Sequence, residues 1–437
     1  MRRRALHDRL AACGQPHVAR AIETLPPEPR ANLLAQLDSI DLDRVDALRR
    51  GEGRAPAPPD HPLPLPYVAA QERSLPGRHA QRGREELSRG RVAFALLAGG
   101  QASRLRWEGP KGTYPIGPRS DRSLFQVLAE QVRRAGRDHG TFPPLAVTTS
   151  PGTDAAIRRF FERNGHFGIG RERLFFACQQ ELPALDDEGR LIFERPDRLF
   201  MSPDGHGGAL SALASARVLD GWADRGITTV CTFQVDNPLL HVVDADLFGR
   251  LLLSPSPIAT KIVLKREPGE RVGVIVESGG RPALVEYSEL PEDLARLRDP
   301  SGALAYRLGS IAMHAFRLDF LRRELQREEL PIHRARRDVE GIDAEGARGR
   351  RPAWKFERFL FDLFPRAPSV EVVEVVRERE YAPLKNLDGP DSPETVRAAL
   401  DAEYRRWHRE AGRPVPAEGM LELSPLHAMG PDDLRTA

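Results

Sequence analysis

Residues 92–111 read VAFALLAGGQASRLRWEGPK, and this stretch decides the fold. It begins with a continuous apolar run that ends in two glycines, as expected of a buried parallel strand leading into a loop. Gly99 and Gly100 let the backbone approach a nucleotide closely, and successive N–H groups of such a loop can hold phosphate oxygens. Because the segment is neither a P-loop nor a GxGxxG fingerprint, it indicates a nucleotide site of another kind.

Strands and helices alternate downstream of this loop. Further apolar runs occur at residues 145–150, 228–236 and 261–265. Helical segments lie between them, at residues 123–135 and 209–225. This alternation predicts a doubly wound α/β domain whose ligand site lies beyond the carboxyl ends of its strands. Residues 272–288 and 369–376 are predicted to add hairpin or edge strands to this sheet.

The two ends of the chain are predicted to form smaller parts. Residues 1 to about 50 have the apolar spacing of helices, interrupted at Pro26 and Pro27. The Pro-rich residues 55–66 are typical of an extended connector. We therefore predict an N-terminal helical region with its linker, a central catalytic domain and a small C-terminal domain, with the bounds 1–88, 89–384 and 385–437.

Composition excludes several classes of protein. The formal net charge of +2 over 437 residues gives no overall field for nucleic acid or an anionic membrane. No apolar run is long enough to span a bilayer, and the N-terminus lacks the apolar stretch of a signal peptide, so we expect a cytoplasmic protein. Three widely spaced cysteines argue against a disulfide framework or a structural zinc site.

The motifs around the glycine loop occur in the order of a known family. LLAGGQASRLR is followed by PKG at residues 110–112 and SLFQ at residues 123–126. Later matches are FFERNGHFG, QQELPAL, SPDGHGGAL, VDNPL, VEYSEL, GSIAMHAF, KFERFLFDLF, EYAPLKN and ELSPL. In this order the sequence resembles the eukaryotic-type UDP-sugar pyrophosphorylases, most closely the UDP-N-acetylglucosamine pyrophosphorylases. The resemblance implies a Rossmann-like doubly wound mixed sheet of the nucleotide-diphospho-sugar transferase type.

The resemblance implies a site for UTP. Its residues would be Leu97, Ala98, Gly99, Gly100, Lys111, Gln179, Gly205, Asp236 and Lys355. Gln179 would read the uracil edge, for which an amide offers both a donor and an acceptor, and Gly205 would lie beside the base. The charged residues implied in catalysis are Arg104, Lys111 and Lys385. Only five lysines occur, and Lys261 and Lys265 also match family lysines, without an assigned chemistry.

Asp236 is the candidate metal ligand. It ends an apolar strand at the edge where such a sheet builds its ligand site, and a carboxylate there suits a Mg²⁺ that bridges phosphate oxygens. The alternative is an aspartate that caps the next helix. The family match of residues 235–237 favours the metal, so Mg²⁺ is the expected cofactor.

The sugar-binding residues implied by the resemblance are His206, Glu286, Ser310, Phe359, Phe361 and Lys385. Both phenylalanines are equally compatible with a place in the core. His206 and Ser310 stand where the N-acetylglucosamine enzymes carry asparagines, and UDP-glucose and broad UDP-sugar pyrophosphorylases carry GHG at the first position. The sugar-binding pocket therefore departs from the pattern of the family that the chain resembles most.

The sequence thus predicts an enzyme that makes a UDP-sugar and pyrophosphate from UTP and a sugar 1-phosphate. UDP-N-acetylglucosamine or a related UDP-N-acetylhexosamine is the first candidate product. A UDP-glucose, UDP-galactose or broad-specificity enzyme is the alternative that His206 and Ser310 favour. A non-catalytic UDP-sugar-binding regulatory protein is a third hypothesis. The presence of Arg104, Lys111 and Asp236 argues against it.

Overall fold

The computed structural model describes residues 2–52, 62–73, 77–287 and 289–435. These residues form two compact units, each built from three stretches of chain. Unit 1 comprises residues 1–57, 179–208 and 330–360, and unit 2 comprises residues 58–178, 209–329 and 361–437, apart from the positions left out above. Most of the predicted connector at residues 55–66 lies outside the described residues. The domain bounds expected from the sequence stay a prediction.

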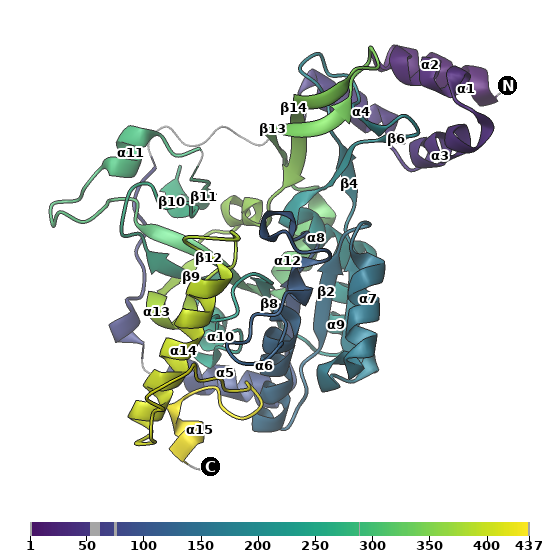
Figure 1. Cartoon of the computed structure of the whole chain (residues 1–437). Coiled ribbons are helices and arrows are strands. Elements are labelled where there is room, and N and C mark those ends of the chain that lie inside the picture. Colours follow the sequence, from purple (N-terminus) through teal and green to yellow (C-terminus); the bar gives the residue numbers. More distant parts are fainter. Residues whose placement is uncertain (1, 53–61, 74–76, 288, 436–437) are drawn as a thin grey trace. The chain divides into compact units, whose positions relative to one another are not determined.

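Unit 2 contains a mixed sheet, which Figure 1 shows with helices around it. Its strands in the described residues are β1 (Val92–Leu97), β2 (Leu145–Thr149), β3 (Leu174–Cys178), β8 (Thr229–Gln234), β9 (Ile258–Leu264), β10 (Val274–Ser278), β11 (Arg281–Val285), β12 (Leu308–Arg317) and β15 (Glu371–Glu374). The order is β11-β10-β12-β8-β1-β2-β3, with β9 paired to β12 and β15 paired to β9. Strands β8, β1, β2 and β3 are parallel, whereas β12 runs antiparallel to its neighbours. The predicted strands at residues 92–97, 145–150, 228–236 and 261–265 are confirmed.

Helices cover both faces of this sheet. Neighbouring residues of a strand point to opposite faces, and Phe175 and Phe176 of β3 show where two helices lie. Phe176 contacts Phe161 of α7 (Asp154–Arg163), whereas Phe175 contacts Trp222 of α9 (Val218–Asp224). The doubly wound arrangement is therefore confirmed.

The remaining helical elements that lie wholly in unit 2 surround the sheet. They are η1 (Ala70–Glu72), α5 (Arg78–Ser88), η2 (Ser103–Leu105), η3 (Lys111–Thr113), α6 (Leu124–His139), η4 (Gly165–Gly168), η5 (Arg171–Arg173), α10 (Ala245–Leu253), α11 (Glu292–Arg296), α12 (Leu318–Arg327), α13 (Arg377–Glu380), α14 (Pro393–Glu410) and α15 (Pro431–Arg435). The unit boundary falls within α8 (Gly205–Ser215) and η6 (Leu360–Arg366). The predicted helical segment 209–225 is divided between α8 and α9, because Arg217 has a φ of 56° and interrupts it.

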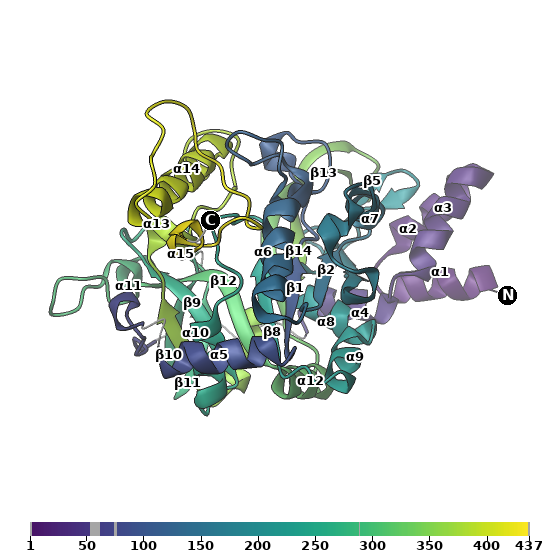
Figure 2. The same ribbon diagram turned by 90° about the horizontal axis from the view of Figure 1, so that it is seen from below.

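Helices α5 and α10 cross closely, as Figure 2 shows. A Cβ atom on Gly83 would come within 1.8 Å of the Ala245 carbonyl oxygen, and one on Gly249 within 1.7 Å of the His79 carbonyl oxygen. Neither backbone carbonyl can move aside cheaply, so both glycines are required for this crossing.

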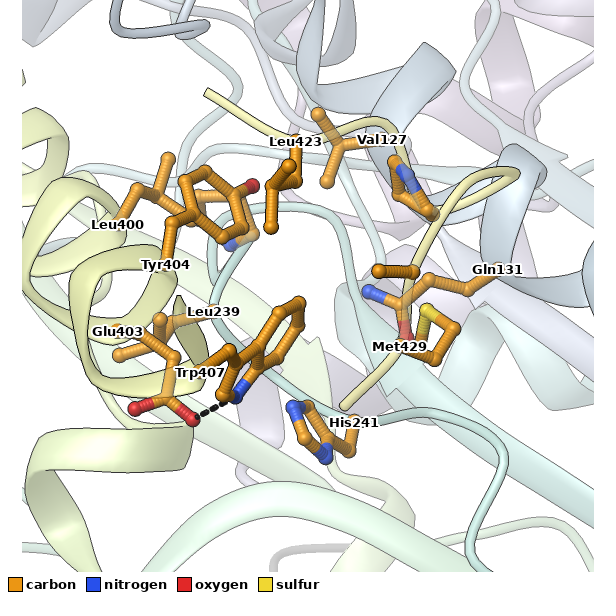
Figure 3. Close-up of a pocket in the computed structure, with 13 residues that line it drawn as sticks. Val127, Gln131, Leu239, His241, Leu400, Glu403, Tyr404, Trp407, Leu423 and Met429 are labelled. Atoms are coloured by element: carbon orange, nitrogen blue, oxygen red, sulfur yellow. Dashed lines mark hydrogen bonds between the residues drawn. The ribbon is translucent and has the colours of Figure 1, made fainter. Parts of the chain in front are cut away.

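The C-terminal segment packs against the loop that follows β8. Leu400, Tyr404 and Trp407 of α14 face Leu239 and His241 around a small cavity of about 20 Å³ (Figure 3). Trp407 Nε1 donates to Glu403 Oε1 at 2.7 Å on one side of this cavity. The volume suffices for about one water molecule, so this contact is a packed interface within unit 2 rather than a ligand pocket.

Unit 1 joins four N-terminal helices to strands from two later stretches of the chain. The helices are α1 (Arg2–Ala12), α2 (Pro16–Thr24), α3 (Pro27–Asp38) and α4 (Leu42–Arg50). The strands are β4 (Glu181–Pro183), β5 (Phe193–Arg195), β6 (Arg198–Leu199), β7 (Met201–Pro203), β13 (Ile332–Ile342) and β14 (Arg348–Arg358). Gln15 donates to the Gly189 carbonyl at 3.0 Å and accepts from the Leu191 N–H at 2.7 Å, which fixes the helices to the loop before β5. The predicted break at residues 26–27 separates α2 from α3.

A buried group of charges lies beneath the carboxyl edge of the sheet in unit 2. Lys261 of β9 is fully buried, and its Nζ lies 2.8 Å from Asp244 Oδ2 and 2.5 Å from Glu380 Oε2. Arg73 donates to both oxygens of Asp244, at 2.7 and 2.8 Å, and to Asp246 at 2.9 Å. Burial opposes the charge on Lys261, but the two carboxylates raise its pKa above the usual value. Lys261 is therefore charged and holds β9, α10 and α13 together.

We expect Lys261→Met to lower the free energy of unfolding by about 3–5 kcal/mol, because it leaves buried carboxylates without their cation. The matched control is Lys265→Met, since Lys265 is also buried but its Nζ donates only to the Pro268 carbonyl among the hydrogen bonds described, at 3.1 Å. That variant should lose about 1 kcal/mol. Urea unfolding of both variants measures the difference, and equal losses would contradict the role given to Lys261.

Candidate active site

The glycine loop after β1 is held in place by the next strand. Ser150 follows β2, is buried, and donates its hydroxyl to the Gly99 carbonyl at 2.8 Å. Lys111 N donates to the Gly100 carbonyl at 3.3 Å, which closes the loop. Gly99 is buried and Gly100 is exposed, with no atom within 4 Å of the place where a Cβ would stand. The loop therefore presents backbone to solvent at the carboxyl edge of the sheet.

Three charged side chains gather beside this loop. The parallel register of β1 and β8 aligns Leu97 with Gln234, so Asp236 emerges at the edge where the loop begins. Lys111 Nζ lies 3.3 Å from Asp236 Oδ2, and both side chains keep part of their surface exposed. Leu384 N donates to the Asp236 carbonyl at 2.8 Å and thereby places Lys385 next to Asp236.

Lys385 is held in its charged form. Burial opposes the charge, but Tyr381, Asp236 and Asp391 together raise the pKa of Lys385 above its usual value. Its Nζ lies 6.0 Å from the centroid of the Tyr381 ring. Two ammonium groups and one carboxylate therefore stand together at the end of β8, an arrangement suited to a polyanion.

Arg104 and Arg106 extend from the same loop. Arg104 lies in η2 and is exposed. Arg106 ends that turn with a φ of 51°, in the left-handed region that favours glycine. An arginine in this conformation costs about 1 kcal/mol in backbone strain.

Glu286 and Ser310 both lie close to Gly273 in unit 2. Ser310 N donates to the Gly273 carbonyl at 2.9 Å, and a Cβ on Gly273 would stand 3.4 Å from Glu286 Oε1. Ser310 also accepts from the Ala312 N–H at 3.3 Å, at a bulge of β12 where Ala312 has a φ of 56°. Phe361 is buried in η6.

A second group of predicted site residues lies in unit 1. Gln179 Nε2 donates to Asp204 Oδ1 and to the Gly205 carbonyl, both at 3.2 Å. The Arg358 guanidinium donates to Asp204 Oδ2 at 3.0 Å. Burial raises the pKa of Asp204 to about 6, although Arg358 and the Gln179 amide oppose this shift.

His206 is stacked on Phe359 in the same unit. The two ring centroids are 5.2 Å apart, and Phe359 lies 4.3 Å from the ring of His333. Burial of the ring, with a smaller contribution from His333, lowers the pKa of His206 to about 4. Leu360 N donates to His206 Nδ1 at 2.9 Å, so the neutral ring carries its proton on Nε2. His206 therefore presents an N–H donor.

Lys355 is also in unit 1, on β14. Its Nζ stands 5.0 Å from the centroid of the Phe200 ring, and burial lowers the pKa of Lys355.

Of the predicted site residues, the structure brings Lys111, Asp236 and Lys385 together in unit 2.

Gln179, Gly205, His206 and Phe359 belong to unit 1. Asp204 and Arg358 belong to that group, and sequence reasoning missed both. Asp204 lies inside the quoted SPDGHGG motif, but no periodicity signals that it is buried.

Residues 62–73, 77–287 and 289–435 contain no helix long and apolar enough to cross a membrane, nor do residues 2–52.

Comparison with known proteins places these features in a family. The family described as UTP--glucose-1-phosphate uridylyltransferase matches residues 64–408. The human UDP-N-acetylhexosamine pyrophosphorylase-like protein 1 is 37% identical over 92% of this chain and 85% of its own length. The Arabidopsis thaliana UDP-N-acetylglucosamine diphosphorylase 1 is 33% identical over 99% of this chain and 90% of its own length.

A solved structure agrees with these relatives. The uridine diphosphate N-acetylglucosamine pyrophosphorylase from Trypanosoma brucei superposes with a TM-score of 0.82, at 27% identity, over 99% of this chain and 94% of that chain. The glycine loop, the charged cluster at the end of β8 and these similarities lead to one conclusion: the chain belongs to the UTP--glucose-1-phosphate uridylyltransferase family and is a uridylyltransferase.

Proposed function

We propose that this uridylyltransferase transfers the uridylyl group of UTP to an N-acetylhexosamine 1-phosphate, giving a UDP-N-acetylhexosamine and pyrophosphate. The observation that carries the proposal is the cluster of Lys111, Lys385 and Asp236 beside the exposed backbone of the glycine loop. The choice of sugar is supported by relatives of 33–37% identity that are named for N-acetylhexosamine or N-acetylglucosamine.

We propose the nucleotide contacts that the family resemblance implies. In this assignment the loop of Leu97, Ala98, Gly99 and Gly100 contacts uridine and phosphates, and Gln179 and Gly205 contact the base. Arg104, Lys111 and Lys355 are the proposed phosphate contacts. The proposed sugar contacts are His206, Glu286, Ser310, Phe359, Phe361 and Lys385.

The reaction needs no general base. An oxygen of the sugar phosphate, already anionic at neutral pH, attacks the α-phosphorus of UTP in line with the leaving group. A new P–O bond forms as the bond to pyrophosphate breaks, and pyrophosphate leaves with the electron pair. Arg104, Lys111 and Lys385 stabilise the negative charge on the reacting phosphates, so the chain contributes positioning and positive charge.

We propose Mg²⁺ as the cofactor, held by Asp236 together with phosphate oxygens of the substrates. Mg²⁺ is commonly bound by one or two carboxylates and substrate phosphates rather than by a cage of protein ligands. The site fits this pattern, because the Asp236 carboxylate keeps part of its surface exposed beside the Lys111 ammonium, 3.3 Å away. When bound, the ion supplies charge neutralisation at the phosphates.

The alternative product is a UDP-hexose without the acetamido group. His206 favours it, since its neutral ring accepts through Nδ1 from Leu360 N and keeps only a donor at Nε2, where an asparagine offers a donor and an acceptor. Ser310 likewise replaces an asparagine amide by a hydroxyl. The family match argues against the third hypothesis, a non-catalytic UDP-sugar-binding protein. We expect a cytoplasmic protein without nucleic-acid or membrane partners.

Pyrophosphate release from UTP should be measured in the presence of Mg²⁺, with the 1-phosphates of N-acetylglucosamine, N-acetylgalactosamine, glucose and galactose as second substrates. We expect the highest kcat/KM with an N-acetylhexosamine 1-phosphate. A preference for glucose or galactose 1-phosphate would establish the alternative product. Absence of turnover with every sugar phosphate would refute the enzyme and leave the binding protein.

His206→Asn should raise the kcat/KM ratio of N-acetylglucosamine 1-phosphate over glucose 1-phosphate by about tenfold, because an amide adds the acceptor that the neutral imidazole lacks. His427→Asn, an exposed histidine in unit 2, is the control and should leave the ratio unchanged. The same ratio in His206→Asn and in the unsubstituted enzyme would remove His206 from sugar selection.

Lys111→Met and Asp236→Asn should each lower kcat by about 100-fold or more while the thermal unfolding midpoint stays close to that of the unsubstituted enzyme. The control is Asp121→Asn, which removes an exposed carboxylate in the same unit and should keep kcat within about twofold. Steady-state kinetics measure kcat for the three variants and for the unsubstituted enzyme. A full rate in either site variant would overturn the role given to that residue.

The His206 ring should stay neutral, with its proton on Nε2, from pH 8 down to about pH 5, because its pKa is lowered to about 4. Nitrogen-15 NMR of the histidine rings reports tautomer and charge. In the unfolded chain this histidine titrates near pH 6.5. The folded state therefore loses stability relative to the unfolded chain as pH falls from about 6.5 toward 4. Titration of His206 near pH 6.5 in the folded enzyme would contradict its burial.

A further inference from the structure

The amide of Gln179 has one possible orientation. Its Nε2 donates to Asp204 Oδ1 and to the Gly205 carbonyl oxygen, both at 3.2 Å. Both neighbours are acceptors, so only the amide nitrogen can face them. Both hydrogens of Nε2 are therefore engaged in these two hydrogen bonds. Any further partner of this amide meets the carbonyl oxygen, which can only accept a hydrogen bond.

Asp204 is itself held rigidly. Asp204 is 1% exposed as a residue, and Arg358, which donates to Oδ2 at 3.0 Å, is 4% exposed. The backbone is fixed as well, since Arg358 N donates to the Asp204 carbonyl at 2.7 Å and Asp204 N donates to the Gln180 carbonyl at 3.0 Å. A Cβ on Gly208 would come within 1.8 Å of Asp204 Oδ1, so this glycine leaves room for the carboxylate.

We propose that Asp204 is a positioning residue that makes the enzyme select UTP over CTP, by fixing the Gln179 amide so that its carbonyl oxygen meets the base. The inference rests on the proposed function, in which Gln179 contacts the base. Uracil has an N–H at N3, which donates to this oxygen, whereas cytosine has a lone pair at N3. The fixed amide therefore accepts from uracil and meets the cytosine ring nitrogen with an unpaired acceptor.

Selection of this kind requires that the amide cannot turn over. A free glutamine would rotate and donate Nε2–H to cytosine N3, and the discrimination would be lost. Sites built to hydrogen-bond one partner reject another because the buried polar groups are left unpaired. Asp204 supplies the constraint because a carboxylate accepts only and Arg358 keeps it in place.

The test is Asp204→Asn, measured as the ratio of kcat/KM for UTP to kcat/KM for CTP at pH 8 with the best sugar 1-phosphate. Arg358 offers only donors, so the substituted side chain must present its amide oxygen to Arg358 and direct its NH₂ group at Gln179. The Gln179 amide then lies between an NH₂ group at position 204 and the Gly205 carbonyl, one donor and one acceptor, so it is no longer fixed in one orientation toward the base. We expect the UTP to CTP ratio to fall at least about tenfold.

Two further variants distinguish a positioning role of Asp204 from a loss of structure. Gln15→Met removes a buried amide of unit 1 that contacts residues 189 and 191, and it should lower the unfolding temperature without changing the ratio. In Gln179→Met the amide is absent, so adding Asp204→Asn should leave the ratio within about twofold. If Asp204→Asn does not fold, Asp204→Ser, which also removes the carboxylate, should lower the ratio in the same direction.

The outcomes are distinguishable. If the unsubstituted enzyme releases no pyrophosphate from UTP with any sugar 1-phosphate, the proposed function fails. If it turns over UTP and folded Asp204→Asn or Asp204→Ser keeps the original UTP to CTP ratio, the role of Asp204 fails while the proposed function stands. A fall in the ratio that is equally large in the Gln179→Met background also overturns the proposal.

Discussion

The buried ammonium of Lys261 is the constraint on which unit 2 depends. A fully buried charge is tolerated only with opposite charges around it, and here Asp244 and Glu380 supply them. Asp244 also accepts from the Leu247 N–H at 3.0 Å and begins α10. Glu380 ends α13, directly before the segment that carries Lys385. One amine therefore fixes the sheet, a helix and the segment that holds a proposed catalytic lysine.

The same segment is fastened to the end of β8 by Asn237. Its side chain donates to the Glu380 carbonyl at 2.7 Å and accepts from the Ala382 N–H at 3.1 Å. Asp236 and Lys385 thus stand side by side through backbone contacts rather than through their own attraction. Hydrogen bonds of this kind hold charged groups in place before a polyanion binds.

The sheet of unit 2 could be predicted because its strands are buried on both faces. Val92–Leu97 and residues 228–236 read as continuous apolar runs, and the parallel register that follows places the glycine loop next to Asp236. The hairpin of β10 and β11 was also visible, since alternation and the Gly279–Gly280 turn mark it. Local pattern and tertiary contact agree at these positions.

Other features carry no local signal. Strand β14 begins RGRRP, a sequence that does not read as a strand, and it is held by eleven residues of pairing with β13. The left-handed φ of Arg106 is set by the turn that contains it, against the preference of its own side chain. The proton position on His206 depends on the backbone N–H of Leu360, 154 residues away. Contacts between residues so far apart in the sequence form only when the chain folds.

Unit 1 has a consequence for synthesis of the protein on the ribosome. Helices α1 to α4 are made before the strands that they contact, since the Leu191 N–H that Gln15 binds is 176 residues further along and β13 comes later still. Pairing over such separations is slow, because a long loop must close before the contact is gained. The apolar faces of Leu10, Val18 and Leu33 thus remain open while most of the chain emerges. These helices therefore complete their core late, and until then their apolar faces are exposed to aggregation or chaperone binding.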